Sequence, residues 1–524
     1  MKTAVQSSQK KAVVTVLSMI AAMVLSKGLG MVRSMCMSYA YGTGWEANAF
    51  SAASRIPLSF FDLLFSAAIL GCFIPVYNGF RSDPSIPETE QEREADRFAC
   101  IFLNFVLLLT GLLSALGMIF ARPIIAVITP GLPEETAALA ASLLRIMFPM
   151  ILFTGSAYTL VGILQSKEHF LLPSLISAVS NLGVILYFLL LNGRLGERGI
   201  YGLAAAYLCS WALQLLTLAV PLAKLRFPYR PLLDFRNPAL KKALRMTPPI
   251  MIGSWLAPVG MLAGTHFAAQ LPTSGAVTVF EYAVNINTIV TGILTYGICN
   301  FTFPRLSRQS ASGDETAFSS TARTGILSAL AIVLPVMAAV LILSGEGTAI
   351  LYLRGAFTAE DTVETALALR CIALGMPAFC LTEIVSRIMY ARTSVYVPMT
   401  AALCGAAVNI LSSAILVKTS AGTLRVGTVA LANAFGQTVC AAILVIAMLR
   451  QVKGILDRGF LISVCKLTLL TLLSAAVMAG MAVLLHNDPA EAGLLRNLLV
   501  CAAVFLPGAL IYLAGLKVLR VRFQ

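Results

Sequence analysis

Long apolar runs separated by short polar stretches dominate the sequence. Fourteen of these runs are long enough to cross a membrane as a helix, which takes about 20 predominantly apolar residues. They lie near 12–40, 47–79, 98–121, 136–165, 171–192, 200–223, 246–270, 276–304, 323–344, 362–390, 395–417, 426–449, 461–485 and 495–516. The pattern predicts an all-α polytopic membrane protein with about 14 transmembrane helices.

A weak internal repeat divides the chain. Three residues of the first half recur 225 positions later, where Glu135, Arg145 and Pro173 match Glu360, Arg370 and Pro398. The repeat predicts two six-helix pseudo-symmetric lobes related by an axis along the membrane normal, followed by two further helices. The predicted limits are 1–224 for the N-lobe, 225–245 for a basic cytoplasmic linker, 246–450 for the C-lobe, and 451–524 for the last two helices and a cytoplasmic tail.

Composition and charge agree with the membrane interpretation. Hydrophobic residues make up 58% of the chain and charged residues 12%, whereas soluble domains carry about 25% charged residues. Of the 38 Lys and Arg residues, 24 fall in loops on one side of the predicted spans and 7 in loops on the other. Because cytoplasmic loops are enriched in Lys and Arg, both termini are expected in the cytoplasm. This bias also explains the net charge of +14 without a nucleic-acid partner.

Several chemistries have no support in the sequence. The eleven cysteines form no CxxC motif and the three histidines are dispersed, so neither a disulfide framework nor a metal site is predicted. No nucleotide-binding P-loop, GxSxG or HExxH motif is present. An embedded glycosyl- or acyltransferase would lack an identifiable catalytic set. A transporter without a cofactor is therefore expected, rather than an enzyme.

The first two predicted spans carry unusual charge. Lys27, Arg33, Glu46, Arg55 and Asp62 all lie within or beside them, and each charge in hydrocarbon costs roughly 2.5–3.5 kcal/mol on insertion scales. Lys27 and Arg33 are six residues apart, about 120° around a helix, so both can line one broad face. Gly28 and Gly30 between them allow a bend or a close approach of backbones.

A polar stripe is expected on the second span, where Asn48, Arg55 and Asp62 follow one another at intervals of seven residues. Such a stripe must face the protein interior or a water-filled cavity. Two interpretations stay open. The charges can pair with one another for structural reasons, for example Arg55 with Asp62 or Glu46 with Lys27. Alternatively, they form a cationic cavity for an anionic substrate, since arginine binds phosphate bidentately and lysine acts as a point charge.

The second lobe is less cationic at the corresponding place, because Asn285 lies near the repeat position of Arg55. The cationic cavity is therefore expected mainly on the first lobe. The predicted substrate-binding residues are Lys27, Arg33, Asn48, Arg55 and Asn285. The predicted cavity-lining residues are Glu46, Asp62, Glu281 and Arg387.

Several strings resemble the MurJ/MviN lipid II flippase family of the MOP transporter superfamily: SKGLGMVR (26–33), GTGWEANAFSAASRIP (42–57), FIPVY (73–77) and GAFTAEDT (355–362). The resemblance implies a flippase that moves polyprenyl-diphosphate-linked peptidoglycan precursor from the inner to the outer leaflet of the bacterial inner membrane. A central cavity would open alternately to each side. Lys27 and Arg33 would contact the diphosphate or a nearby sugar, and the last two helices would form a groove for the lipid tail.

The chain departs from the family at several positions. Asn48 stands for a usual aspartate, Asp62 lies where many members have basic residues, Ser66 replaces a common glutamate, and Asn285 replaces an arginine. No Asp or Glu lies in the predicted seventh, eleventh or twelfth helices, so a coupling ion or membrane potential is expected without an identifiable ion site. The expected partners are the lipid-linked diphosphate and membrane lipids, with the protein working as a monomer. The alternatives are a flippase for another polyprenyl-linked oligosaccharide and a MATE-type multidrug or cation antiporter.

Overall fold

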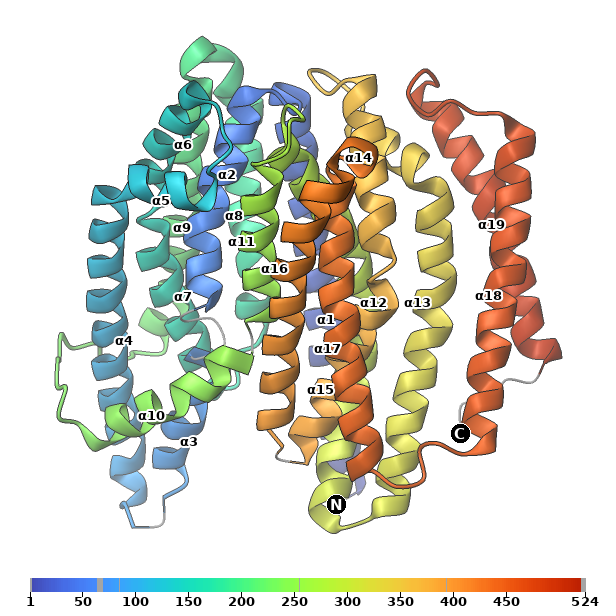
Figure 1. Cartoon of the computed structure of the whole chain (residues 1–524). Coiled ribbons are helices and arrows are strands. Elements are labelled where there is room, and N and C mark those ends of the chain that lie inside the picture. The colour runs from blue at the N-terminus through green and yellow to red at the C-terminus, as the bar shows by residue number, and fades with distance from the viewer. Residues whose placement is uncertain (1, 64–68, 84, 254, 393, 520–524) are drawn as a thin grey trace. The chain divides into compact units, whose positions relative to one another are not determined.

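The computed structural model describes residues 2–63, 69–83, 85–253, 255–392 and 394–519 (Figure 1). Within these residues the chain is helical and contains no strand. The α-helices are α1 (Lys2–Tyr41), α2 (Trp45–Phe61), α3 (Ile74–Arg81), α4 (Glu88–Ile119), α5 (Ala121–Ile128), α6 (Glu134–Met147), α7 (Met150–Ser166), α8 (Leu171–Leu190), α9 (Gly199–Lys224), α10 (Pro238–Gly253), α11 (Leu256–Ala268), α12 (Ala276–Ser312), α13 (Glu315–Tyr352), α14 (Ala359–Ala373), α15 (Met376–Ala391), α16 (Tyr396–Leu424), α17 (Gly427–Gln451), α18 (Arg458–Leu485) and α19 (Leu494–Val518). Three short elements complete the set, the π-helix η2 (Ile69–Phe73) and the 3₁₀ turns η3 (Asn192–Arg194) and η4 (Gly196–Arg198).

Ten described helical segments are long and apolar enough to cross a membrane. An eleventh span results when α14 and α15, which are bent by 43° relative to each other, are counted together. The other three predicted spans, near 12–40, 47–79 and 246–270, include positions that the structure does not fully describe. The all-helical, multi-span fold is confirmed, and the total of fourteen stays a prediction.

The helix bounds follow the internal repeat. Helices α6 and α7 are separated by a break at Phe148 and Pro149, and α14 and α15 by a break at Leu374 and Gly375. Each bound of the second pair lies 225 or 226 residues after its counterpart in the first. The spacing found in the sequence therefore marks equivalent broken helices.

The chain forms two compact units. Unit 1 comprises Met1–Met37 and Ala49–Pro258, and unit 2 comprises Ser38–Asn48 and Val259–Gln524. The predicted linker therefore belongs to unit 1, while the connection between α1 and α2 belongs to unit 2. The lobe limits expected at 224, 245 and 450 stay predictions.

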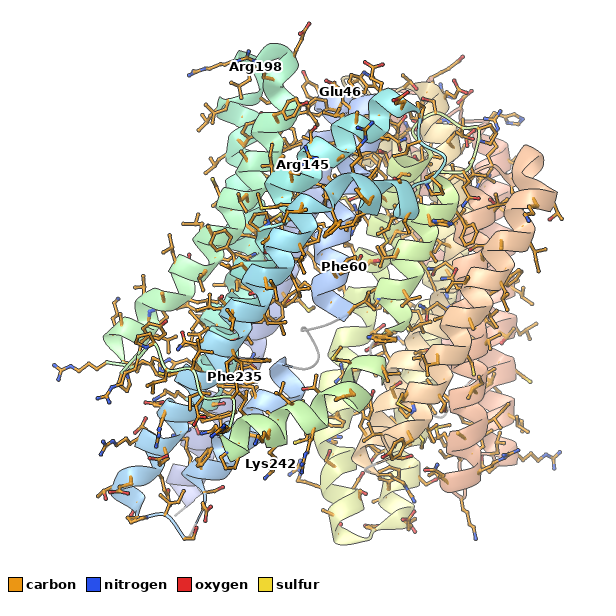
Figure 2. All side chains as sticks on the ribbon, turned by 60° about the vertical axis from the view of Figure 1, so that its left-hand side comes forward. Glu46, Phe60, Arg145, Arg198, Phe235 and Lys242 are labelled. Carbon is orange, nitrogen blue, oxygen red and sulfur yellow. The ribbon has the colours of Figure 1, made fainter. Side chains whose placement is uncertain are left out.

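Unit 1 is held together by an aromatic core and a tethered linker. Phe73 is fully buried and stacks on Tyr77 and Phe98, with ring centroids 5.5 and 5.6 Å apart. The linker before α10 is fastened to α4, where the amide of Asn104 donates to the backbone carbonyls of Arg230 and Leu232 at 3.0 and 3.1 Å. In Figure 2, Phe235 and Lys242 lie at the end of unit 1 opposite Arg198. The linker and the turn that carries Arg198 therefore lie at opposite ends of unit 1.

In unit 2, the last two helices pack on α13. The Tyr512 hydroxyl of α19 donates to the carbonyl of Ala331 at 2.9 Å, and Ser474 of α18 donates to the carbonyl of Gly508 at 2.8 Å. Buried apolar side chains of α13, α18 and α19 complete the contact, among them Leu327 and Leu467. Figure 1 shows these three helices side by side.

Candidate functional site

The charged part of α1 is fixed against α8 within unit 1. The Asn181 amide donates to the carbonyl of Ser26 at 3.1 Å, and the Ser26 hydroxyl donates to the carbonyl of Ser174 at 3.4 Å. The close approach of α1 to α8 depends on Gly30, because a Cβ at this position would lie 3.3 Å from Nδ2 of Asn181. A Cβ on Gly28 would meet no atom within 4 Å. Of the two glycines predicted to permit close packing, only Gly30 is placed at the contact.

Arg33 lies on an aromatic surface in unit 1. Its guanidinium carbon is 5.4 Å from the ring centroid of Tyr207. Tyr207 in turn stacks on Trp211 at 5.4 Å and meets Phe50 of α2 edge-on at 4.9 Å. A guanidinium over an aromatic face gains about 0.5–2 kcal/mol depending on its desolvation. The Tyr207 ring therefore stabilises the Arg33 guanidinium, which forms no ion pair among the described residues.

The other predicted cations of unit 1 lie on the same two helices. Lys27 on α1 and Arg55 on α2 are both half-buried, and Asp62 is exposed just beyond the end of α2. Among the residues that the structure describes, Lys27 makes no ion pair. The predicted residues of unit 1 thus comprise three cations and one carboxylate, an excess of positive charge on α1 and α2. Ser66 lies outside the described residues.

Asn48 has a structural partner that the sequence did not reveal. Its side-chain oxygen accepts hydrogen bonds from the backbone N–H groups of Val277 and Thr278, at 3.1 and 3.4 Å. These groups belong to the first turn of α12, whose own N-cap residue, Gly275, has no side chain to offer. Asn48 therefore caps a helix more than two hundred residues away in the sequence. A contact between Asn48 and substrate stays a prediction.

The remaining predicted residues lie in unit 2 and carry a more balanced charge. Glu281 and Asn285 are one turn apart on α12 and both half-buried. Arg387 forms an ion pair with Glu383 on the preceding turn of α15, with 3.8 Å between nitrogen and oxygen. Glu46 lies in the first turn of α2. Nothing in this arrangement produces the cationic excess found on α1 and α2 of unit 1.

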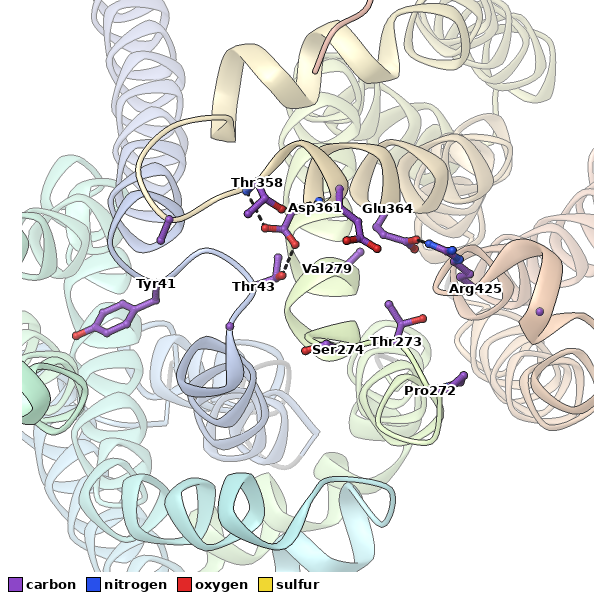
Figure 3. Close-up of a pocket in the computed structure, with 14 residues that line it drawn as sticks. Tyr41, Thr43, Pro272, Thr273, Ser274, Val279, Thr358, Asp361, Glu364 and Arg425 are labelled. Atoms are coloured by element: carbon purple, nitrogen blue, oxygen red, sulfur yellow. Dashed lines mark hydrogen bonds and ion pairs between the residues drawn. The ribbon is translucent and has the colours of Figure 1, made fainter. Parts of the chain in front are cut away.

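Residues 42–48, which begin one sequence string, meet the string 355–362 within unit 2 (Figure 3). The Thr43 hydroxyl donates to the Asp361 carboxylate at 2.5 Å, and the N–H of Ala356 donates to the carbonyl of Tyr39 at 2.9 Å. Gly42 has φ of 57°, and a Cβ there would lie 2.3 Å from the carbonyl oxygen of Ala356. Only glycine fits this backbone conformation and this contact. The start of the first string and the second string are therefore parts of one local structure.

The family model described as "Lipid II flippase MurJ" matches residues 37–498, which is most of the chain. The chain belongs to the MurJ lipid II flippase family. It is accordingly a multi-pass membrane protein with the architecture of a transporter.

Individual MurJ relatives are distant but extensive. The probable lipid II flippase MurJ of Rhizobium tropici is 27% identical over 477 residues, covering 88% of this chain and 85% of the relative. The probable lipid II flippase MurJ of Buchnera aphidicola subsp. Schizaphis graminum is 27% identical over 377 residues, covering 72% of each chain. The lipid II flippase MurJ of Burkholderia cenocepacia is 25% identical over 399 residues, covering 75% of this chain and 76% of the relative.

Solved structures confirm the fold. A lipid II flippase MurJ in an inward closed conformation matches with a TM-score of 0.78 and 21% identity, covering 96% of this chain and 98% of the other. An inward-facing MATE family multidrug transporter of the MOP superfamily matches with a TM-score of 0.69 and 16% identity, covering 82% and 95%. At these identities both matches concern the fold alone.

Two contacts of this chain are not predicted by its sequence. One is the capping of α12 by Asn48, for which the glycine preceding α12 was the available signal. The other is the joining of Thr43 to Asp361. Thr358 and Asp361 do carry the capping-box pattern, and α14 begins with a complete capping box. That pattern predicts the helix start, but it contains no information on the distant Thr43.

Proposed function

We propose that this chain moves lipid II from the inner to the outer leaflet of the bacterial inner membrane by alternating access. The diphosphate would be held by the cations of α1 and α2, and both termini would face the cytoplasm. Family membership supports the activity. The observation that carries the site is Arg33, a cation kept on the Tyr207 ring rather than in an ion pair among the described residues.

A diphosphate head group needs compensating positive charge to cross a membrane. A diphosphate cannot cross hydrocarbon unassisted, because burying an unpaired charge costs many kcal/mol. Lys27, Arg33 and Arg55 provide compensating positive charge on one unit, while Arg387 of the other unit is already paired with Glu383. A one-sided site binds the head group and still allows its release. An ion gradient or the membrane potential would supply direction, and a monomer suffices for this scheme.

Depletion in the host tests the activity. We expect lipid II to accumulate in the inner leaflet of cells that have no second flippase, and unchanged lipid II distribution would refute the proposal. Loss of another surface polymer with intact peptidoglycan would instead identify a different polyprenyl-linked oligosaccharide. Export of organic cations without any change in lipid II would identify a MATE-type antiporter.

Substitution of Arg33 tests the site. Arg33→Ala should lower lipid II translocation in proteoliposomes at least tenfold, because a hydrogen bond to a charged group is worth about 1.5–3 kcal/mol. Lys27→Arg should be tolerated, since it keeps the charge, and Tyr207→Phe should keep the aromatic support. Arg198→Ala, on an exposed turn of the same unit, is the matched control. Full activity of Arg33→Ala at normal protein levels would refute the cationic site.

A further inference from the structure

A second polar site lies entirely within unit 2 (Figure 3). A cavity of about 760 Å³ opens among four loops, those that join α1 to α2, α11 to α12, α13 to α14, and α16 to α17. The loop charges predict that all four face the outer side of the membrane. The volume is in the range of sites for organic ligands and is far larger than an ion requires.

The wall formed by the two sequence strings is held in place. The Asp361 carboxylate accepts from the Thr43 hydroxyl through one oxygen and from the backbone N–H of Thr358 through the other. Both oxygens of Asp361 are thus satisfied by the protein. Its role is to position the loop, and the carboxylates left for a ligand are those of Glu360 and Glu364.

Glu364 is the unusual member of the lining. Its side chain is 5% exposed, and one carboxylate oxygen pairs with the guanidinium of Arg425. The other oxygen, Oε2, is buried and has no hydrogen-bond partner among the described residues. Burying a carboxylate oxygen without a hydrogen-bond donor costs free energy, because the oxygen loses its contact with water and gains no partner in return. The site therefore lacks one donor that a ligand can provide.

The charge and chemistry of the cavity define that donor. Three carboxylates, Glu360, Asp361 and Glu364, face one guanidinium, Arg425, so the lining keeps a net negative charge. The hydroxyl-bearing residues Thr273 and Ser274 add possible acceptors to the same lining. Within the described residues no three His, Cys, Asp or Glu side chains gather as a metal-binding group. An ammonium group, with three donors and a positive charge, matches this arrangement of acceptors.

We propose that this cavity binds a primary ammonium group on the peptide of lipid II once the head group has reached the outer side. The inference rests on the proposed function and adds a second, acidic subsite to the cationic one. Glu364 and Glu360 of unit 2 would hold the amine.

The test compares two forms of one ligand on the full-length protein in lipid nanodiscs. One is lipid II whose peptide carries a free side-chain amino group, and the other is the same molecule after N-acetylation of that group. Binding is measured by titration, and translocation is measured in proteoliposomes. We expect acetylation to weaken binding about tenfold, the size expected for one charge-assisted hydrogen bond.

Variants assign the effect to the cavity. Glu364→Gln and Glu360→Gln should each bind the free-amine form as weakly as the acetylated form and leave binding of the acetylated form unchanged. The side chain of Glu360 is exposed and makes no hydrogen bond in the described structure, so its variant remains informative if Glu364→Gln does not fold. Glu491→Gln, on the exposed loop between α18 and α19, is the matched control and should keep the tenfold difference.

The outcomes separate the two proposals. Equal binding of both ligand forms by the unmodified protein, with translocation intact, would overturn the ammonium site and leave the flippase proposal standing. A preference that survives in both Glu variants would also overturn it. Absence of binding and translocation for both forms would refute the flippase proposal and the subsite together.

Discussion

The side-chain oxygen of Asn48 accepts a hydrogen bond from the backbone N–H of Val277, 3.1 Å away. This contact joins the start of α2 to the start of α12 and satisfies N–H groups that a helix leaves open at its first turn. Asn48 therefore has a structural role that does not depend on substrate. An aspartate at this position could accept the same hydrogen bonds.

The first prediction follows from this cap. Asn48→Ala should lower the free energy of unfolding by about 1 kcal/mol, the usual cost of removing a side-chain cap. Asn48→Asp should preserve stability, because a carboxylate accepts the same bonds and favours the positive end of the helix dipole. The measurement is the thermal midpoint of the detergent-purified protein. Asn78→Ala, at an exposed position of α3, is the control, and equal midpoints for the two Ala variants would contradict the capping role.

The second prediction compares two glycines of α1. Gly30→Leu should destabilise the protein by about 1–3 kcal/mol, because an added side chain would displace the Asn181 amide from Ser26. Gly28→Leu should be tolerated, since no atom lies within 4 Å of the position its Cβ would occupy. Both changes introduce the same residue into the same helix, so the difference in thermal midpoint isolates the contact with α8. Similar midpoints would show that α1 does not depend on this approach.

The third prediction concerns the two carboxylates that bind Lys167 in unit 1. Asp96 is 6% exposed, lies 3.2 Å from Nζ and accepts a hydrogen bond of 2.6 Å from Tyr77, whereas Glu92 lies 2.8 Å from Nζ and is 64% exposed. Asp96→Asn should cost about 2–3 kcal/mol of stability, because a hydrogen-bonded buried charge is lost. Glu92→Gln should cost less than about 1 kcal/mol, since solvent screens an exposed pair. The measurement is the thermal midpoint of both variants under the same conditions. A larger loss of stability in Glu92→Gln than in Asp96→Asn would contradict the prediction.

The fourth prediction is a pH dependence at the start of α18. The N–H of Phe460, followed by the Arg323 guanidinium, holds the pKa of Asp457 below its usual value of 3.8. A lowered pKa in the folded state stabilises the protein above the unfolded pKa, and this contribution disappears as the pH falls through the folded value.

Asp457→Asn keeps a capping oxygen but cannot carry the charge. The difference in thermal midpoint between the parent protein and this variant should be constant above about pH 5 and shrink below pH 3.8. The measurement is a series of melting curves in one detergent at constant ionic strength. A difference that does not change with pH would exclude a role for the charge.

The properties that could be predicted from the sequence are those encoded locally. Apolar runs indicated the helical spans, because hydrophobic length is a property of contiguous residues. The recurrence of Arg145 at Arg370 marked two equivalent segments, since a repeat preserves spacing, whereas the break within each segment was found only in the structure. The strings around Arg33 and Trp45 identified the family, because short motifs are read without knowledge of contacts.

The tertiary structure decided which polar residues act together. Asn48 and Val277 are 229 residues apart, and Thr43 and Asp361 are 318 apart, so no local pattern predicts either pair. Charge counting alone left open whether Arg33 forms an ion pair, and its position over Tyr207 depends on the packing of α1 against α9. The sequence by itself determined a helical, multi-span membrane protein of the MurJ family with cations in its first spans. Only folding, which brings distant loops to one end of a unit, created the acidic cavity at Glu364.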